Sequence, residues 1–119
     1  MRRLFALCAV VLVALAACDE PPAAEPYARG AQLFRKLDCG RCHFIDGQGG
    51  RIAPELTHVG TNAASRAAGV SAEDYIRRSI QDPGSYIVPG FQDIMPRGLA
   101  RNLSTADLDA LVLYLSRHE

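Results

Sequence analysis

The 119-residue sequence predicts an all-α fold for three reasons. Apolar residues recur at helical spacing in three segments, which begin near residues 27, 71 and 104. The second and third segments open with SAED and STAD, in which a serine precedes an acidic residue by three or fewer positions, as at helix N-termini. No stretch alternates convincingly between apolar and polar residues, as a half-buried strand would. We therefore expect one helical domain.

Residues 1–17 are expected to be a secretory signal peptide. Arg2 and Arg3 make a basic start, and an unbroken apolar run follows over residues 4–17. This run is too short to cross a bilayer core, which takes roughly 20 residues, so an uncleaved membrane anchor is the less favoured alternative. The acidic, proline-rich stretch at residues 18–26 predicts a tether that leads to the folded domain.

The junction at Cys18 resembles the signal of bacterial lipoproteins. The run Leu-Ala-Ala ends at Cys18, and in such signals the cysteine is acylated and becomes the new N-terminus. At least two acyl chains would give stable anchoring. Asp19 follows, and in Gram-negative lipoproteins an aspartate there tends to keep the product at the inner membrane. The resemblance implies a lipid-anchored protein on the periplasmic side of the bacterial inner membrane. Soluble export with an unmodified Cys18 is the alternative.

The first helix is expected over residues 27–37. Tyr27, Gly30, Phe34 and Leu37 lie on one stripe of this segment. Gly30 has no side chain and would allow another backbone to approach closely.

Two further helices are expected in the second half of the chain. One begins at Ser71 and ends before Pro83, and the other begins after Ser104. Their apolar faces are expected to comprise Ile76, Ile80, Leu108, Leu111, Val112 and Leu115. The stretch at residues 46–69 lies between the first and second expected helices and is rich in glycine and alanine. It is expected to form loops around a cofactor.

The cluster of Cys39, Cys42 and His43 is the most specific chemical signal in the sequence. A redox dithiol is less favoured because thioredoxin-like C-x-x-C motifs lie in βαβ surroundings. A structural zinc site needs four ligands, and only His58 and His118 remain as a usual fourth donor. C-x-x-C-H is the attachment signature of c-type haem, so one covalently bound haem c is the favoured interpretation. A large apolar cofactor would also complete the core of a small domain that has no tryptophan.

With this cluster and these helices, the chain resembles class I (monohaem) cytochromes c over nearly all of residues 27–119. In that family the first and last helices cross at a glycine, with aromatic side chains beside the contact. Gly30 and Phe34 in GAQLF match the first helix, and Tyr114 in LVLYL matches the last. The resemblance implies a class I cytochrome c fold, with three or more helices wrapped around the covalently attached haem.

Met95 is the candidate for the sixth iron ligand. It is the only methionine after the signal peptide, and the family's axial methionine occupies the corresponding loop, often as Met-Pro. Pro96 favours an extended backbone at Met95, which suits a loop that presents one side chain inward. His58 is the rival ligand, in a bis-histidine site, although a surface histidine is the favoured interpretation. His118 is expected to be solvated.

The resemblance also implies roles around the haem. Pro54 in APEL resembles the family proline whose carbonyl accepts a hydrogen bond from the proximal histidine. That bond would fix the histidine tautomer and make the ring a better donor. Tyr86, Arg77, Arg78 and Arg97 are candidates for hydrogen bonds to the haem propionates, although exposed arginines usually face water.

Charge and composition narrow the function. The chain has 13 basic and 13 acidic residues and no basic patch for nucleic acid. No catalytic constellation stands out, so a non-enzymatic electron carrier is expected. It would pass single electrons between respiratory or photosynthetic complexes. A terminal oxidase is the favoured partner, together with a quinol–cytochrome c oxidoreductase or a dehydrogenase.

Two alternatives remain. A haem-based gas sensor or peroxidase-like module would need a labile sixth ligand, and Met95 argues against it. The segment at residues 75–96 is similar to haem c domains fused to subunit II of some haem–copper oxidases and to c-type subunits of nitric oxide reductases. The chain could therefore be a subunit of such a complex. The sequence contains no copper domain and no expected transmembrane helix, which favours a separate carrier.

Overall fold

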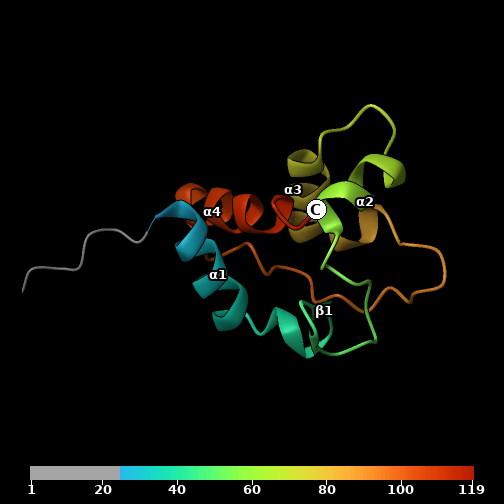
Figure 1. The fold of residues 1–119 in the computed structure, drawn as a ribbon, viewed down its shortest axis with the longest axis horizontal. Coiled ribbons are helices and arrows are strands. Elements are labelled where there is room, and N and C mark those ends of the chain that lie inside the picture. The colour runs from blue at the N-terminus through green and yellow to red at the C-terminus, as the bar shows by residue number, and fades with distance from the viewer. Residues whose placement is uncertain (1–24) are drawn as a thin grey trace, which may run out of the picture.

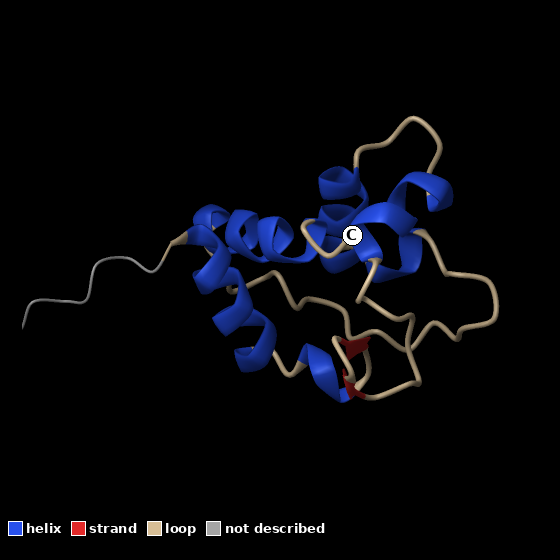
Figure 2. Ribbon diagram, viewed as in Figure 1, coloured by secondary structure: helices blue, strands red, loops and turns tan. Residues whose placement is uncertain are grey.

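A computed structural model describes residues 25–119 of the chain (Figure 1). The four α-helices are α1 (Pro26–Lys36), α2 (Val59–Arg66), α3 (Ala72–Gln81) and α4 (Thr105–Ser116). Two short 3₁₀ helices and two strands complete the described part: η1 (Cys39–Arg41), η2 (Pro83–Ser85), β1 (Phe44–Ile45) and β2 (Gln48–Gly49). Figure 2 shows helices and loops with only this small antiparallel hairpin. The prediction of an all-α fold is confirmed.

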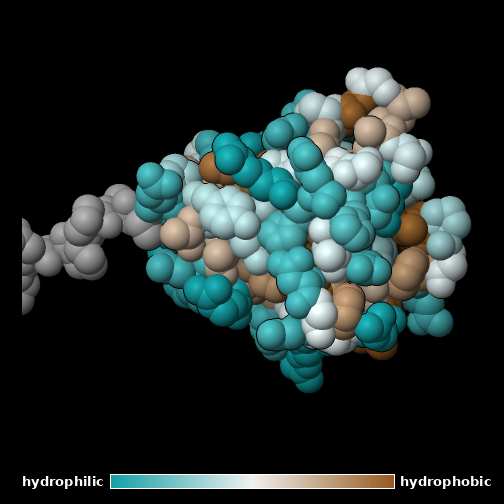
Figure 3. All heavy atoms as spheres, viewed as in Figure 1, coloured by the Kyte–Doolittle hydropathy of each residue, from teal (hydrophilic) through white to brown (hydrophobic). Residues whose placement is uncertain are grey.

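The signal peptide predicted at residues 1–17 and most of the tether predicted at residues 18–26 lie outside the described residues. Within residues 25–119, no helix is both long and apolar enough to cross a lipid bilayer. Figure 3 shows a face of the domain that is mainly hydrophilic, with apolar side chains in small separate groups.

Helices α1 and α4 cross at Gly30, as the family resemblance implied (Figure 1). A Cβ atom on Gly30 would lie 2.5 Å from Cβ of Tyr114 and would overlap the carbonyl oxygen of Ala110. The ring of Tyr114 packs between those of Tyr27 and Phe34, at centroid distances of 5.2 and 5.8 Å. Only glycine allows the two backbones this approach, so the aromatic rings close around the contact rather than separating the helices.

A charged pair also joins these two helices. The guanidinium of Arg29 on α1 donates from Nε and Nη2 to the two carboxylate oxygens of Asp107 on α4, at 2.8 and 3.0 Å. The backbone N–H of Asp107 in turn donates to the hydroxyl of Ser104, the N-cap residue predicted from STAD. Asp107 thus lies in the first turn of α4, where a negative charge also suits the helix dipole.

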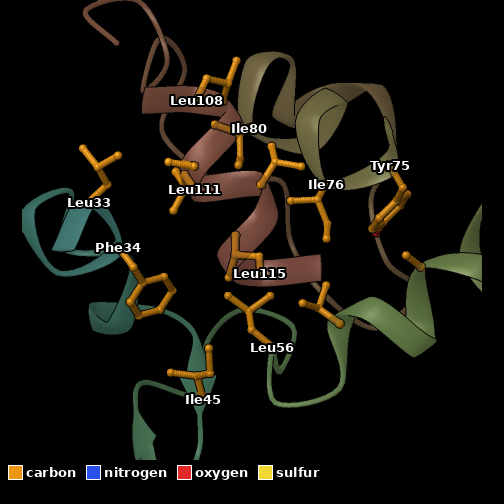
Figure 4. Packing of buried hydrophobic residues seen from close by; sticks show 14 residues of the cluster. Leu33, Phe34, Ile45, Leu56, Tyr75, Ile76, Ile80, Leu108, Leu111 and Leu115 are labelled. Carbon is orange, nitrogen blue, oxygen red and sulfur yellow. The ribbon is translucent and has the colours of Figure 1, made fainter. Parts of the chain in front are cut away.

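The apolar core is built around α4 (Figure 4). Leu111 and Leu115 of α4 lie between Phe34 of α1 and Ile76 of α3. Helix α3 begins at the predicted cap, where the backbone N–H of Asp74 donates to the Ser71 hydroxyl. All six apolar residues expected on the second and third predicted helices are buried.

The prediction of loops throughout residues 46–69 is wrong in part, because α2 forms within this stretch. The buried residues of α2 are Val59, Gly60 and Ala63, and two of these are among the smallest residue types. The sequence of this segment therefore shows no long apolar stripe. A Cβ atom on Gly60 would overlap the carbonyl oxygen of Ser116 in α4. Helix α2 is therefore positioned by a close backbone contact, which apolar periodicity does not reveal.

The prediction that His118 is solvated is also wrong, since only 8% of this residue is exposed. Its Nδ1 atom lies 2.9 Å from the carbonyl oxygen of Tyr114, and its Nε2 atom lies 3.1 Å from Oδ2 of Asp46. The His118 carbonyl also accepts from the N–H of Gly60, at 2.8 Å. The chain after α4 therefore turns back against α2 and the hairpin.

Candidate functional site

A cavity of about 380 Å³ lies beside the apolar core. This volume falls within the range of ligand-binding pockets. Its walls come from α1, η1, residues 53–56, α2, α3, α4 and the long connection between η2 and α4. Apolar lining residues from these elements include Phe34, Leu56, Ile76, Ile80, Leu111 and Leu115. The cavity is therefore suited to a large apolar ligand with few polar contacts.

Cys39, Cys42 and His43 enter the cavity from a single tight turn. Asp38, with φ of 57°, starts η1 in the left-handed region, and the backbone N–H groups of Cys42 and His43 both point to the carbonyl oxygen of Cys39. The two cysteines are half-buried free thiols. Burial raises the pKa of the Cys39 thiol to about 11, so this thiol stays protonated at neutral pH.

Two glycines allow the hairpin to pack against this turn. The N–H of Gly50 donates to the carbonyl oxygen of Gly40 at 2.9 Å, and a Cβ atom on Gly50 would overlap the Arg41 carbonyl oxygen. Gly49 has φ of 106°, and a Cβ atom there would overlap the carbonyl oxygen of His43. Gly49 and Gly50 thus serve close backbone packing against the cysteine turn.

His43 is held by a hydrogen bond to Pro54, as the family resemblance implied. Its Nδ1 atom lies 2.7 Å from the Pro54 carbonyl oxygen, which can only accept, so Nδ1 carries the proton and Nε2 keeps a free lone pair. Burial lowers the pKa of His43, while the bond to Pro54 opposes this and the charge of Arg66 adds to it. The neutral ring with its free Nε2 is the form that binds metals.

Met95 lines the same cavity and is half-buried against the core. The neighbouring apolar residues Ile87, Phe91 and Ile94 also line the cavity, although they are 36%, 36% and 48% exposed. A flat apolar ligand in the cavity would cover these side chains. The residues present therefore fit a haem, with sulfur and imidazole donors among apolar walls.

His58, the rival ligand, does not line this cavity. It lies exposed at the N-terminus of α2, where its Nδ1 atom is 2.9 Å from the carbonyl oxygen of Glu119. Within residues 25–119, no three His, Cys, Asp or Glu side chains gather as a metal-binding group. The structure thus brings Cys39, Cys42, His43 and Met95 to one cavity and leaves His58 outside it.

The structure separates the candidates for propionate contacts. Tyr86 lines the cavity, whereas Arg77 pairs with Asp109 on α4 at 2.6 Å and does not line it. Arg97 is likewise paired with Asp93, and Arg78 lines a smaller neighbouring pocket.

Sequence reasoning missed several polar residues of the cavity, among them Arg66 and Tyr75. Arg66 falls in α2, which was expected to be a loop, so no helical face could be assigned to it. Tyr75 falls in the predicted second helix, one position before the expected apolar residue Ile76. Counting positions from Ile76 and Ile80 would have placed Tyr75 beside that face.

A comparison with known families accounts for this arrangement. The family model described as cytochrome c matches residues 27–119, which include the C-x-x-C-H turn, the cavity and almost all of the four helices. No curated protein matches the chain significantly. The match extends over most of the chain, and the cavity offers the thiols and the imidazole that covalent haem attachment requires. The chain therefore belongs to the cytochrome c family and is a haem-based electron carrier with covalently bound haem c.

Proposed function

We propose that this cytochrome c is a membrane-tethered carrier that passes single electrons between respiratory or photosynthetic complexes. A lipid on Cys18 would hold it at the periplasmic face of the bacterial inner membrane. The observation that carries the electron-transfer part is that His43 and Met95 line one cavity with both attachment cysteines. The tether rests on the sequence at the signal junction alone.

The turn that carries Cys39, Cys42 and His43 has two roles in this proposal: it attaches the haem covalently and it supplies an iron ligand. The thiols of Cys39 and Cys42 would each add across a vinyl group, with sulfur bonding to one carbon and hydrogen to the other. This addition involves no net oxidation. His43 would bind the iron through Nε2, and the Pro54 carbonyl would hold the ring in the required tautomer. Cys39, Cys42 and His43 would thus fix the cofactor from one short segment.

Met95 would supply the second protein ligand to the haem iron. Bound haem supplies an iron that alternates between the ferrous and ferric states. A thioether favours the ferrous state, so Met95 would raise the reduction potential above that of a bis-histidine site. The exposed position of His58, bonded to the Glu119 carbonyl, supports Met95 over His58 in this role.

The partners would be redox proteins that dock briefly. Without Arg2 and Arg3 of the predicted signal, the 13 basic residues become 11 against 13 acidic residues, so the processed chain is slightly acidic. Small and short-lived interfaces are usual for electron transfer. A terminal oxidase is the proposed acceptor, and a quinol–cytochrome c oxidoreductase or a dehydrogenase is the proposed donor. A permanent place in an oxidase or reductase complex is the second candidate, because residues 75–96 are similar to haem c domains of such complexes.

The absorption spectrum of the purified holoprotein tests axial ligation. We expect the weak red band of Met–Fe(III) ligation in the oxidised state and slow binding of carbon monoxide in the reduced state. Met95→Ala should abolish the band, lower the potential and open the iron to carbon monoxide. His58→Ala is the matched control and should change none of these. Wild-type protein that lacks the band and binds carbon monoxide readily would falsify the carrier proposal and favour a gas-binding module.

A further inference from the structure

The segment that carries Met95 has few polar links to the rest of the domain. Residues 86–103 contain no helix or strand, and their backbone hydrogen bonds to other described residues all stay within the segment. Within the described part of the chain, Asp93 and Arg97 are the only residues of this segment whose side chains make hydrogen bonds. The position of Met95 therefore depends on apolar packing and on the contacts of Arg97.

The contacts of Arg97 enclose Met95. Its Nη1 and Nη2 atoms donate to the two carboxylate oxygens of Asp93, at 2.6 and 2.7 Å, and Nη1 also lies 3.1 Å from the carbonyl oxygen of Met95. Asp93 and Arg97 are each two residues from Met95, so the paired side chains close an arch with Met95 at its centre. The arch joins the Met95 backbone to two half-exposed side chains, while the side chains of Met95 and Asp93 line the cavity.

Gly84 provides the surface on which this arch rests. A Cβ atom on Gly84 in η2 would lie 2.6 Å from Nη2 of Arg97 and 3.7 Å from Oδ2 of Asp93. The guanidinium therefore packs directly on the backbone of η2. This contact connects the arch to the end of α3, which belongs to the packed core.

We propose that Arg97 is a positioning residue which, through Asp93 and Gly84, holds Met95 over the cavity and slows its displacement by other ligands. This inference rests on the proposed ligation by Met95. A bidentate Arg–carboxylate pair is geometrically specific, so it restrains the backbone between its partners more than a single contact would. Arg97 does not line the cavity itself, and it would act through the Met95 carbonyl and through Asp93, which does line it.

The test is the rate at which imidazole binds the oxidised holoprotein, because imidazole can bind only after Met95 has left the iron. Arg97→Gln should increase this rate by about threefold to tenfold, the effect of losing one or two hydrogen bonds. Arg97→Lys keeps the charge without the planar fork and should give an intermediate rate. The red band of Met–Fe(III) ligation should persist in both variants, because Met95 remains.

Two further variants separate positioning from general stability. Arg77→Gln removes the exposed Arg77–Asp109 pair, also 2.6 Å long, and should leave the imidazole rate unchanged. Gly84→Ala adds a methyl group at the guanidinium, which is free to swing away, so the rate should rise while the fold is kept. A rate for Arg97→Gln equal to that of wild type or of Arg77→Gln would overturn the inference.

Met95→Ala in the same assay distinguishes two cases: that Arg97 does not position Met95, and that Met95 is not the iron ligand. If Met95→Ala binds imidazole rapidly while Arg97→Gln behaves as wild type, Met95 is the ligand and the arch does not position it. If Met95→Ala binds imidazole as slowly as wild type, Met95 is not the iron ligand, and the proposed role of Arg97 is wrong as well.

Discussion

His43 and Pro54, eleven residues apart in the chain, are joined by a 2.7 Å hydrogen bond from ring to carbonyl. Proline restricts its own φ and the backbone of Ala53 before it, so the carbonyl is held in one direction. The bond therefore links the tautomer of His43 to the stiffness of a neighbouring loop.

Pro54→Ala should loosen this bond without removing the carbonyl. Without the proline ring the backbone at residue 54 is more flexible, so the hydrogen bond to His43 should open more often. The His43 Nδ1 proton should then exchange with solvent about twofold to fivefold faster. Nuclear magnetic resonance of the reduced holoprotein measures this exchange. Pro89→Ala, at an exposed position outside the cavity, is the control and should leave the exchange rate unchanged. Equal rates in Pro54→Ala and wild type would show that the loop is held by other contacts.

Gly30→Ala should destabilise the domain, although alanine is the better helix former. The new methyl group would overlap the Ala110 carbonyl, and overpacking of this kind costs about 1–3 kcal/mol of unfolding free energy. Gly40→Ala is the control, because its Cβ atom would meet only Cε1 of Phe34 at an ordinary 3.6 Å. Denaturant unfolding of both variants measures the difference. A Gly30→Ala protein as stable as Gly40→Ala would contradict the close crossing of α1 and α4.

The Arg29–Asp107 pair should make stability depend on pH. The hydrogen bond from Arg29 lowers the pKa of Asp107 below its usual value. A lowered carboxyl pKa means that the folded state favours the ionised form. The stabilisation is therefore fully present above the ordinary aspartate pKa and is lost as the pH falls through the lowered value.

Asp107→Asn should accordingly be less stable than wild type at neutral pH, and the difference should shrink on acidification. Urea unfolding over a pH series measures this trend. In an Arg29→Gln background, the same aspartate substitution should lose most of its pH dependence. A difference between Asp107→Asn and wild type that stays constant from neutral to acidic pH would exclude the pair as its source.

Cys18→Ser should release the protein from membranes. The predicted acylation requires the Cys18 thiol, so the variant should move to the soluble periplasmic fraction, as checked by fractionation and by mass spectrometry of the N-terminus. Cys8→Ser is the matched control, because Cys8 lies inside the predicted signal and should leave with it. Membrane association that persists in Cys18→Ser would favour an uncleaved anchor or a tightly bound partner.

Prediction from the sequence succeeded at positions where the residue type has a specific structural role. The serine caps at Ser71 and Ser104 and the helix crossing at Gly30 are all present in the structure. Each depends on local chemistry, either a hydroxyl that satisfies a free N–H or a glycine that lacks a side chain. The caps could be predicted without knowledge of the rest of the fold, whereas the last helix as the partner of Gly30 was implied by the family resemblance.

Prediction failed where tertiary contacts decide the structure. Helix α2 is placed by the contact of Gly60 with α4, and His118 is buried because Asp46, far away in sequence, meets its ring. The hairpin strands are two residues each, too short to show any alternation. Helix α2 places Arg66 on the cavity wall. Because this helix was not predicted, the position of Arg66 could not be predicted either.

The contact between α1 and α4 has a consequence for chain continuity. It joins the first and last helices directly, while the connection between α2 and α3 passes through exposed Gly69, where φ is 77° and no atom lies within 4 Å of a Cβ position. A chain nicked at that point would give one fragment with Cys39, Cys42 and His43 and another with Met95. The helix crossing would keep these fragments together as a complementing pair, so the two sides of the iron site could be exchanged as separate peptides.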